Sequence, residues 1–222
     1  MTSFSVIESR AAKRKGGARQ LAKLLPKPRS AAALANTPDA FFLSALAKQI
    51  FRAGFVWKIV EYKWPDMEEA FAGFDPAMVA GLDARDLDAL AGDPRIIRNR
   101  AKIESVHDNA RWMVRVAAAH GSFGKFLAEW PENDIVGLWE ELRKSGARLG
   151  GMTGPFFLRE VGKDTFLLSP DVVKALRRAK VVKRDATSKR DLRAVQEALN
   201  VWREQSGRPL CQLSRILACS VG

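Results

Sequence analysis

A glycine-rich segment in the second half of the chain constrains its fold more than any other feature. The segment Leu149–Gly154 reads Leu-Gly-Gly-Met-Thr-Gly and separates an amphipathic helical pattern from a second, apolar one within residues 136–162. Glycine adopts the positive φ values that a sharp reversal requires, and it allows another group to approach the backbone closely. The pattern therefore predicts a hairpin of two helices whose turn can hold a phosphate on backbone N–H groups. An ordinary helical turn with glycine at a helix end is the alternative.

Helix signals also dominate the rest of the chain. Residues 5–25 are expected to form a basic, alanine-rich helical segment, and five capping patterns further along are expected to open helices. These patterns are Thr37-Pro38, Asp75-Pro76, Asp83-x-x-Asp86, Asp93-Pro94 and Ser188-x-x-Asp191. The short apolar run that most resembles a strand is Phe166–Leu168. We therefore expect an all-α protein of about eight to ten helices, with a basic N-terminal segment at residues 1–36 and one domain at residues 37–222.

The net charge of the chain indicates an anionic partner. The 222 residues carry a formal charge of +12 at pH 7, and no apolar run approaches the roughly 18 residues that a membrane helix needs. Nucleic acid is therefore the expected partner, and no membrane contact is expected. The first 29 residues lack the apolar core of a secretory signal, so we expect a cytoplasmic protein.

Four further patterns agree in order and spacing with one known family. They are Phe41–Trp57, Phe71–Pro76, Asp93–Ile103 and Asn109-Ala110. Together with the glycine-rich turn, they resemble the DNA-3-methyladenine glycosylase I family of the helix-hairpin-helix DNA glycosylase superfamily over residues 40–162. The resemblance implies a helix-hairpin-helix glycosylase-like bundle and a base-excision repair enzyme. Such an enzyme flips an alkylated purine such as 3-methyladenine out of damaged double-stranded DNA and hydrolyses its N-glycosidic bond. We expect it to be a monomer that associates with the nucleoid.

The resemblance also assigns a base pocket. Trp57 stacks on the flipped base and Phe55 lines the wall, although aromatic residues at helical spacing more often belong to a core. Gln49 stands where the usual family pattern has a glutamate, and its amide can hydrogen-bond a base edge but cannot ionise. Asp171, the nearest carboxylate after the hairpin, is the candidate for the catalytic aspartate of the superfamily. A helix N-cap beside Pro170 is its alternative role.

The same resemblance implies contacts with the DNA backbone. A cationic cluster surrounds an asparagine ahead of residue 103, and the glycine-rich turn is preceded by an arginine. The expected DNA-binding residues are Arg98, Asn99, Arg100, Lys102, Arg148, Gly150, Gly151, Thr153 and Gly154. A solvated helix face is the alternative for the cluster. In the superfamily the carbonyl groups of this turn often bind a monovalent cation, which the resemblance extends to this chain as its one possible cofactor.

No zinc is expected, although the family typically carries one held by cysteines and histidines. The N-terminal cysteine and histidine elements are absent, and His107 and His120 are distant in sequence from Cys211 and Cys219. Because Gln49 replaces the acid, a non-catalytic protein that binds DNA lesions or structured DNA on the same scaffold is the second hypothesis. A basic helical protein that binds nucleic acid through charge alone is the third.

Overall fold

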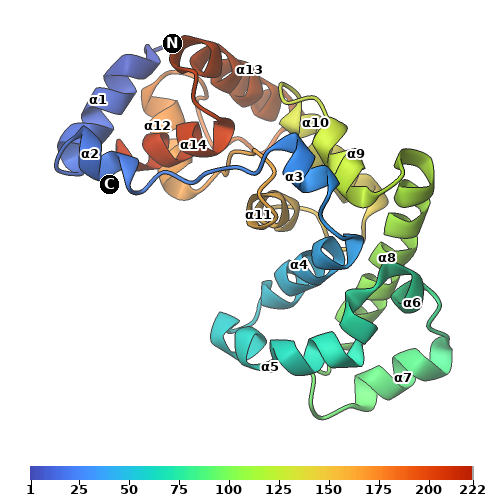
Figure 1. Cartoon of the computed structure of the whole chain (residues 1–222). Coiled ribbons are helices and arrows are strands. Elements are labelled where there is room, and N and C mark those ends of the chain that lie inside the picture. Colours follow the sequence, from blue (N-terminus) through green and yellow to red (C-terminus); the bar gives the residue numbers. More distant parts are fainter. Residues whose placement is uncertain (222) are drawn as a thin grey trace. The chain divides into compact units, whose positions relative to one another are not determined.

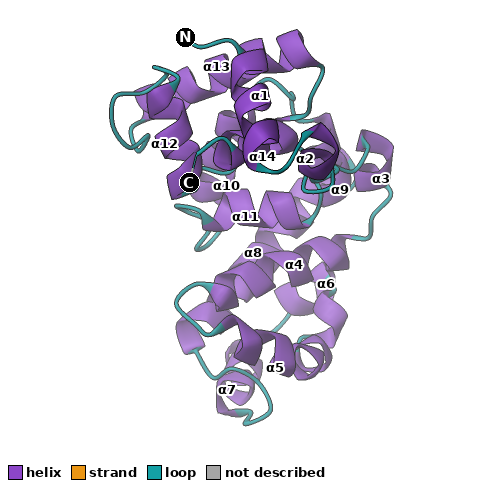
Figure 2. Cartoon of the chain, turned by 90° about the vertical axis from the view of Figure 1, so that its left-hand side faces the viewer, coloured by secondary structure: helices purple, strands orange, loops and turns teal. Residues whose placement is uncertain are grey.

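The computed structural model describes residues 1–221, and all of their regular structure is helical (Figures 1 and 2). It contains fourteen α-helices, more than the eight to ten expected, and one 3-10 turn. The difference comes largely from five-residue helices, namely α2 (Ala18–Ala22), α3 (Ala31–Ala35) and α6 (Pro76–Ala80). No strand occurs among residues 1–221, and the run Phe166–Leu168 has no regular structure.

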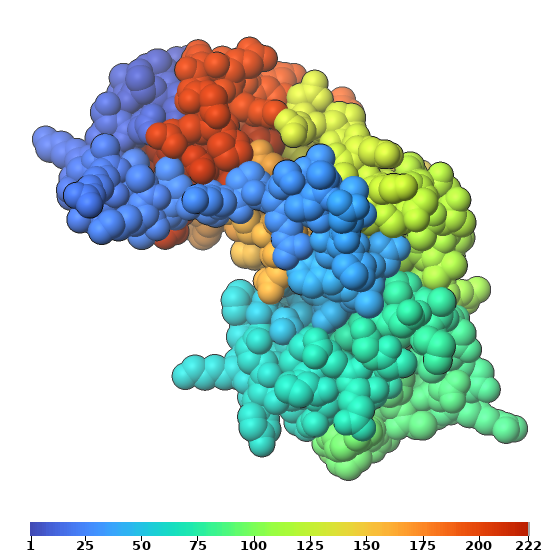
Figure 3. Space-filling view, in the orientation of Figure 1, coloured from blue at the N-terminus to red at the C-terminus, as the bar shows by residue number. Residues whose placement is uncertain are grey.

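The described chain divides into two compact units. The terminal unit comprises residues 1–29, 131–138 and 162–222, and the central unit comprises residues 30–130 and 139–161. This division differs from the predicted boundary at residue 36, because the basic N-terminal helices pack with the C-terminal helices. In the space-filling view, the blue N-terminal residues and the red C-terminal residues share one continuous surface of the terminal unit (Figure 3).

The terminal unit is built around its last helix. Helix α14 (Leu210–Cys219) packs against α1 (Phe4–Arg14), α12 (Pro170–Arg178) and α13 (Lys189–Ser206). Trp202 of α13 is fully buried here, and its Nε1 donates to Thr2 O at 3.1 Å. The helix expected over residues 5–25 is interrupted between α1 and α2, because Gly16 and Gly17 adopt φ values of +83° and +112°.

The central unit is organised by two helices, α4 (Asp39–Arg52) and α8 (Arg100–His120). Both pack against each other and against α6 and α9 (Phe123–Glu129). Helix α4 also contacts α5 (Trp57–Ala70), the 3-10 turn (Ala72–Phe74) and α11 (Thr153–Glu160), whereas α8 also contacts α7 (Ala84–Gly92). The remaining helix, α10 (Ile135–Ser145), leads into the turn before α11.

The capping patterns predicted most helix starts. Asp75 caps α6, Asp83 forms a reciprocal capping box with Asp86 at α7, and Ser188 caps α13, so these three predictions are confirmed. The prediction at Asp93-Pro94 is wrong, since no helix starts there and α8 begins after Asn99.

The predicted start at Thr37-Pro38 is confirmed to within one residue, because α4 begins at Asp39. The Asp39 carboxylate accepts hydrogen bonds from the N–H groups of Phe123 and Gly124 at 3.0 and 3.3 Å. An acid from the start of α4 therefore satisfies free donors at the start of α9.

The contact between α3 and α9 yields a stability prediction. A Cβ at Gly124 would overlap the Leu34 carbonyl oxygen, a backbone atom that cannot move aside easily. We expect Gly124→Ala to lower the free energy of unfolding by about 1–3 kcal/mol in urea denaturation. Gly92→Ala is the matched control, because this helical glycine has open space around it and a change below about 1 kcal/mol is expected. Equal effects of the two substitutions would contradict this account.

Candidate functional site

The chain leaves α4 through a short loop that carries both predicted aromatic residues. Helix α4 ends at Arg52, Gly54 takes a φ of +75°, and α5 begins at Trp57. Phe55 and Trp57 are 39% and 55% exposed, so neither is a core side chain. The alternative that assigned this pair to the core is therefore wrong. Their role in a base pocket stays a prediction.

Lys102 binds the free carbonyl groups at the C-terminal end of α4. Its side chain is buried, and its ammonium donates hydrogen bonds to Phe51 O at 3.1 Å and to Ala53 O at 2.6 Å. The same group lies 4.4 Å from the centre of the Phe55 ring. Burial lowers the pKa of Lys102, and the charge of Arg148 lowers it further. Instead of the predicted contact with a DNA phosphate, this cation satisfies free carbonyl groups at a helix C-terminus.

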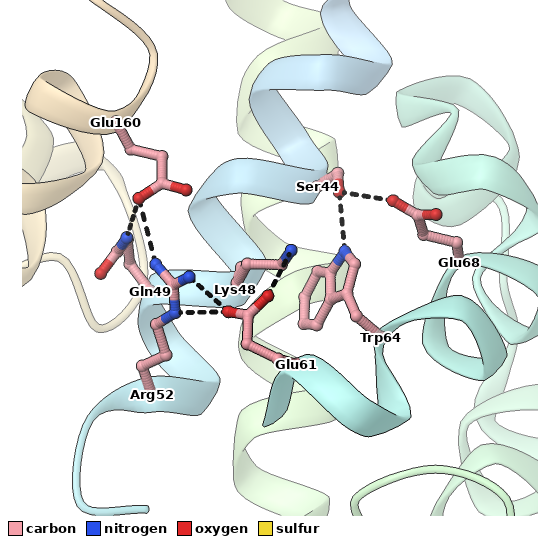
Figure 4. A network of polar contacts seen from close by, with 8 residues as sticks. All are labelled: Ser44, Lys48, Gln49, Arg52, Glu61, Trp64, Glu68 and Glu160. Carbon is pink, nitrogen blue, oxygen red and sulfur yellow. Dashed lines mark hydrogen bonds and ion pairs between the residues drawn. The ribbon is translucent and has the colours of Figure 1, made fainter. Parts of the chain in front are cut away.

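Gln49 lies in α4 and binds a carboxylate that no sequence pattern indicated. Its Nε2 donates to Oε2 of Glu160 at 2.9 Å, although the two residues are 111 positions apart. Arg52 Nη1 donates to the same oxygen at 3.0 Å, as Figure 4 shows. The position that lacks the acid of the family therefore has a carboxylate beside it, supplied by the last residue of α11.

Arg52 connects this carboxylate to the exposed indole of Trp57. Its guanidinium also binds Glu61 of α5, which Lys48 contacts at 3.4 Å. Burial opposes the charge of Arg52, but hydrogen bonds and charge attraction from Glu61 and Glu160 outweigh it and raise its pKa. The hydrogen bond from Arg52 in turn lowers the pKa of Glu61. Since the guanidinium carbon lies 5.2 Å from the centre of the Trp57 ring, a chain of polar contacts runs from Glu160 to Trp57.

The predicted hairpin is present between α10 and α11, and its glycines serve different purposes. Gly151 adopts a φ of +59°, a value that Arg148 also takes without being a glycine. Gly150 and Gly154 do not have a positive φ. Gly154 is needed for close approach instead, because a Cβ there would lie 2.9 Å from Leu149 O.

The turn presents backbone donors where α11 begins. The N–H groups of Gly150, Gly151 and Met152 donate no backbone hydrogen bond to the described residues. Thr153 N–H reaches only Gly150 O, at 3.3 Å, and the helix that starts there directs its positive end toward the turn. This arrangement can hold an anion such as a phosphate.

Helix α8 fixes this turn through a buried asparagine. Asn109 Nδ2 donates to Ser105 O at 2.7 Å and to Ala147 O at 2.9 Å, and its Oδ1 accepts from Ala147 N–H at 2.9 Å. Arg148 is exposed, and its Nε donates to Ala101 O at 3.2 Å. The sequence indicated Asn109 only as part of a motif and gave no signal for its role in holding the turn.

The other predicted DNA-binding residues lie where α8 begins. Asn99 caps the helix, because its Oδ1 accepts a hydrogen bond from a first-turn N–H at 3.1 Å. Arg100 is exposed but pairs with both Asp88 and Glu104. Arg98 is exposed and forms no ion pair with any of residues 1–221. Arg98 is therefore the cation of this cluster that remains available to an anionic partner.

Asp171, the other predicted catalytic residue, belongs to the terminal unit. It is exposed in the first turn of α12, and the helix cap is Ser169, whose Oγ accepts from Val172 N–H at 3.4 Å. The alternative role of Asp171 as the N-cap is therefore filled by Ser169. A catalytic role for Asp171 stays a prediction.

The cysteines and histidines considered as zinc ligands belong to different units, and the absence of zinc stays a prediction. Cys211 and Cys219 are buried in α14, whereas His107 contacts Ala80 O and His120 lies 3.9 Å from Glu129. Within the described residues, no three His, Cys, Asp or Glu side chains gather as metal ligands. That part of the chain also has no helix long and apolar enough to cross a membrane.

Comparison with known sequences identifies similar proteins. The sequence model of the methyladenine glycosylase family matches residues 35–148. DNA-3-methyladenine glycosylase from Haemophilus influenzae is 34% identical over 76 residues, which cover 34% of this chain and 41% of that protein. The chain thus spans less than half the length of this curated relative.

Comparison with solved structures gives the same family. A tyrosine-to-phenylalanine variant of 3-methyladenine DNA glycosylase I, solved with 3-methyladenine, is similar with a TM-score of 0.50 and 27% identity. The similarity covers 57% of this chain and 80% of that one. A glutamate-to-glutamine variant of the Staphylococcus aureus enzyme is similar with a TM-score of 0.50 and 28% identity, over 56% of this chain and 77% of that one.

The asparagine that holds the turn can be tested by substitution. Asn109→Ala leaves the N–H and C=O groups of Ala147 without their partner, so we expect the free energy of unfolding to fall by about 2 kcal/mol. Hydrogen exchange at the Ala147 amide is expected to accelerate more than exchange in α4. Asn36→Ala is the control, since this exposed side chain makes no hydrogen bond with residues 1–221, and an effect within about 0.5 kcal/mol is expected. Unchanged exchange at Ala147 would refute the role of Asn109.

Proposed function

This chain belongs to the methyladenine glycosylase family, and from that membership we propose that it is a DNA N-glycosylase that removes alkylated purines such as 3-methyladenine. The observation that carries the proposal is the exposed Trp57 ring, which Arg52 and then Glu160 connect to the buried amide of Gln49. A flat aromatic surface beside a fixed polar group suits a purine that has been flipped out of its duplex.

The proposed reaction is hydrolysis of the N-glycosidic bond. The flipped base stacks on Trp57, and the Gln49 amide hydrogen-bonds its edge. An N-alkylated purine is cationic within the nucleotide, so the bond electrons return to the ring when the C1′–N bond breaks. The base leaves neutral, water adds to C1′, and one proton is released. Because this leaving group is already activated, base recognition and positioning can compensate for the missing carboxylate at position 49.

The hairpin and Arg98 supply the proposed contacts with the DNA backbone. The N–H groups of Gly150, Gly151 and Met152 favour a phosphate oxygen at the start of α11. The exposed guanidinium groups of Arg98 and Arg148 add charge attraction to a chain with a net charge of +12. Damaged double-stranded DNA is therefore the proposed substrate, and a monovalent cation on the turn carbonyls stays a prediction.

A second candidate function is favoured by one observation. Gln49 cannot ionise, so it cannot offset positive charge on the sugar in the way that a glutamate can. A protein that binds lesions or structured DNA without cutting the glycosidic bond is consistent with this residue.

Release of free base distinguishes the two functions. We expect the protein to release 3-methyladenine from methylated duplex DNA, measured by chromatography of the soluble bases. Trp57→Ala is expected to lower kcat/KM about 10- to 100-fold, in line with about 1–3 kcal/mol for base stacking. Tyr62→Ala is the control, because this tyrosine of α5 is 85% exposed, and its loss is expected to have little effect. Tight binding to abasic-site DNA without base release would instead support the second candidate function, a protein that binds lesions without cutting the glycosidic bond.

The salt dependence of DNA binding tests the role of Arg98. Arg98→Ala is expected to weaken binding to all sequences and to reduce the slope of log K against log salt by about 1. Arg100→Ala is the matched control two residues away, because its guanidinium is already paired with Asp88 and Glu104. A larger loss of slope for Arg100→Ala than for Arg98→Ala would be contrary to this assignment.

A further inference from the structure

The contact between Gln49 and Glu160 carries an inference about base selection. We propose that Glu160 is a positioning residue that fixes the Gln49 amide with its oxygen facing the base pocket. The pocket then presents a hydrogen-bond acceptor at this point. It selects alkylated purines that have an amino group at the facing position over those that have an oxo group there. This inference rests on the proposed function, since it concerns the base that the enzyme takes.

The orientation of the amide follows from the chemistry of its partner. An ionised carboxylate only accepts hydrogen bonds, so the Gln49 atom that lies 2.9 Å from Glu160 Oε2 must be the NH2 group. The opposite orientation would place two oxygen atoms with lone pairs against each other. Figure 4 accordingly shows the Gln49 oxygen pointing away from Glu160.

The amide oxygen is left available for a ligand. Gln49 Oε1 accepts no hydrogen bond from any of residues 1–221, although the side chain is only 6% exposed. The oxygen is not among the fully buried polar atoms that lack a partner, so the small exposed part of this residue leaves it open to solvent and to a ligand. A base amino group that donates to this oxygen would complete the pairing.

Glu160 is itself held in place by Arg52, which a third helix, α5, holds in turn. Its Oε2 accepts from Gln49 and from Arg52 at once, at 2.9 and 3.0 Å. Arg52 is bound on its other side by Glu61 of α5. The carboxylate therefore cannot turn away without breaking two charge-assisted hydrogen bonds, and the amide keeps one orientation.

A fixed acceptor discriminates between bases by the groups on their edges. An amino group donates to Gln49 Oε1, whereas an oxo group faces it with lone pairs and leaves the oxygen unpaired. Sites built to hydrogen-bond a substrate N–H reject analogues that lack it. A glutamine that can flip provides no such selection, because its NH2 group accommodates the oxo base equally well. The carboxylate of Glu160 thus determines the selectivity through Gln49.

The test compares two free bases by isothermal titration of the whole protein: 3-methyladenine, with an amino group at C6, and 3-methylhypoxanthine, with an oxo group there and one added ring N–H. We expect the natural protein to bind the amino base at least about tenfold more tightly. Glu160→Leu, which frees the amide to flip, is expected to reduce this ratio to below about twofold, and the milder Glu160→Gln to reduce it in part. Glu68→Gln is the control, since this neighbouring carboxylate binds Ser44 and not Gln49. An unchanged ratio in Glu160→Leu would overturn the proposal.

Exchange of the two side chains separates positioning from a merely structural role. In the double variant Gln49→Glu with Glu160→Gln, the new glutamine donates to one oxygen of the new glutamate, and the other oxygen still faces the pocket. We expect the preference for the amino base to return. If Glu160 only stabilised the fold, its substitution would weaken the binding of both bases equally. Exchange of the two side chains would then not restore the ratio of their affinities. That pattern would also refute the proposal.

A spectroscopic measurement distinguishes failure of this inference from failure of the proposed function. In the natural protein, one Gln49 Nε2 proton is expected to resonate downfield and to exchange slowly, and Glu160→Gln is expected to shift it. Failure to release base from methylated DNA would reject the glycosylase activity while leaving this signal as the measure of amide orientation. Amide protons of Gln49 that are insensitive to both Glu160 variants would reject the positioning role even in an active enzyme.

Discussion

The buried ammonium of Lys102 fixes the C-terminal end of α4, and the position of the candidate pocket depends on this helix end. A helix C-terminus leaves carbonyl groups without partners, and the chain must still leave α4 in a defined direction. Lys102 donates to two of these carbonyls, Phe51 O and Ala53 O, and so sets the start of the loop that carries Phe55 and Trp57. The cost of burying a cation is offset by these hydrogen bonds and by the face of the Phe55 ring.

Helix α8 extends this constraint to the hairpin. Lys102, Ser105 and Asn109 are spaced by three and four residues, so they lie on one face of the helix. Lys102 binds the end of α4, whereas Asn109 binds the backbone of the turn before α11. A single helix thereby sets the spacing between the proposed base pocket and the proposed phosphate site within the central unit.

The features that the sequence predicted well are those with local causes. A capping side chain and the N–H group it binds are two or three residues apart, so Asp75, Asp83 and Ser188 were recognisable from their neighbours. The glycine turn was recognisable for the same reason. Glu160 had no such signal, because its partner Gln49 comes from a distant helix. A signal for Lys102 did exist, since it shares a helical stripe with the buried residues Val106 and Asn109, but its charge favoured an exposed role.

The shortness of α11 has a mechanical consequence. Eight residues at about 1.5 Å each make a strut of roughly 12 Å, with the proposed phosphate-binding turn at one end and Glu160 at the other. Packed helices shift as stiff bodies, so a displacement of the turn is transmitted along the strut with little loss. On the proposed assignments, the residue that orients the Gln49 amide belongs to the same helix whose start binds the DNA backbone. Backbone binding and base recognition are then mechanically coupled through α11.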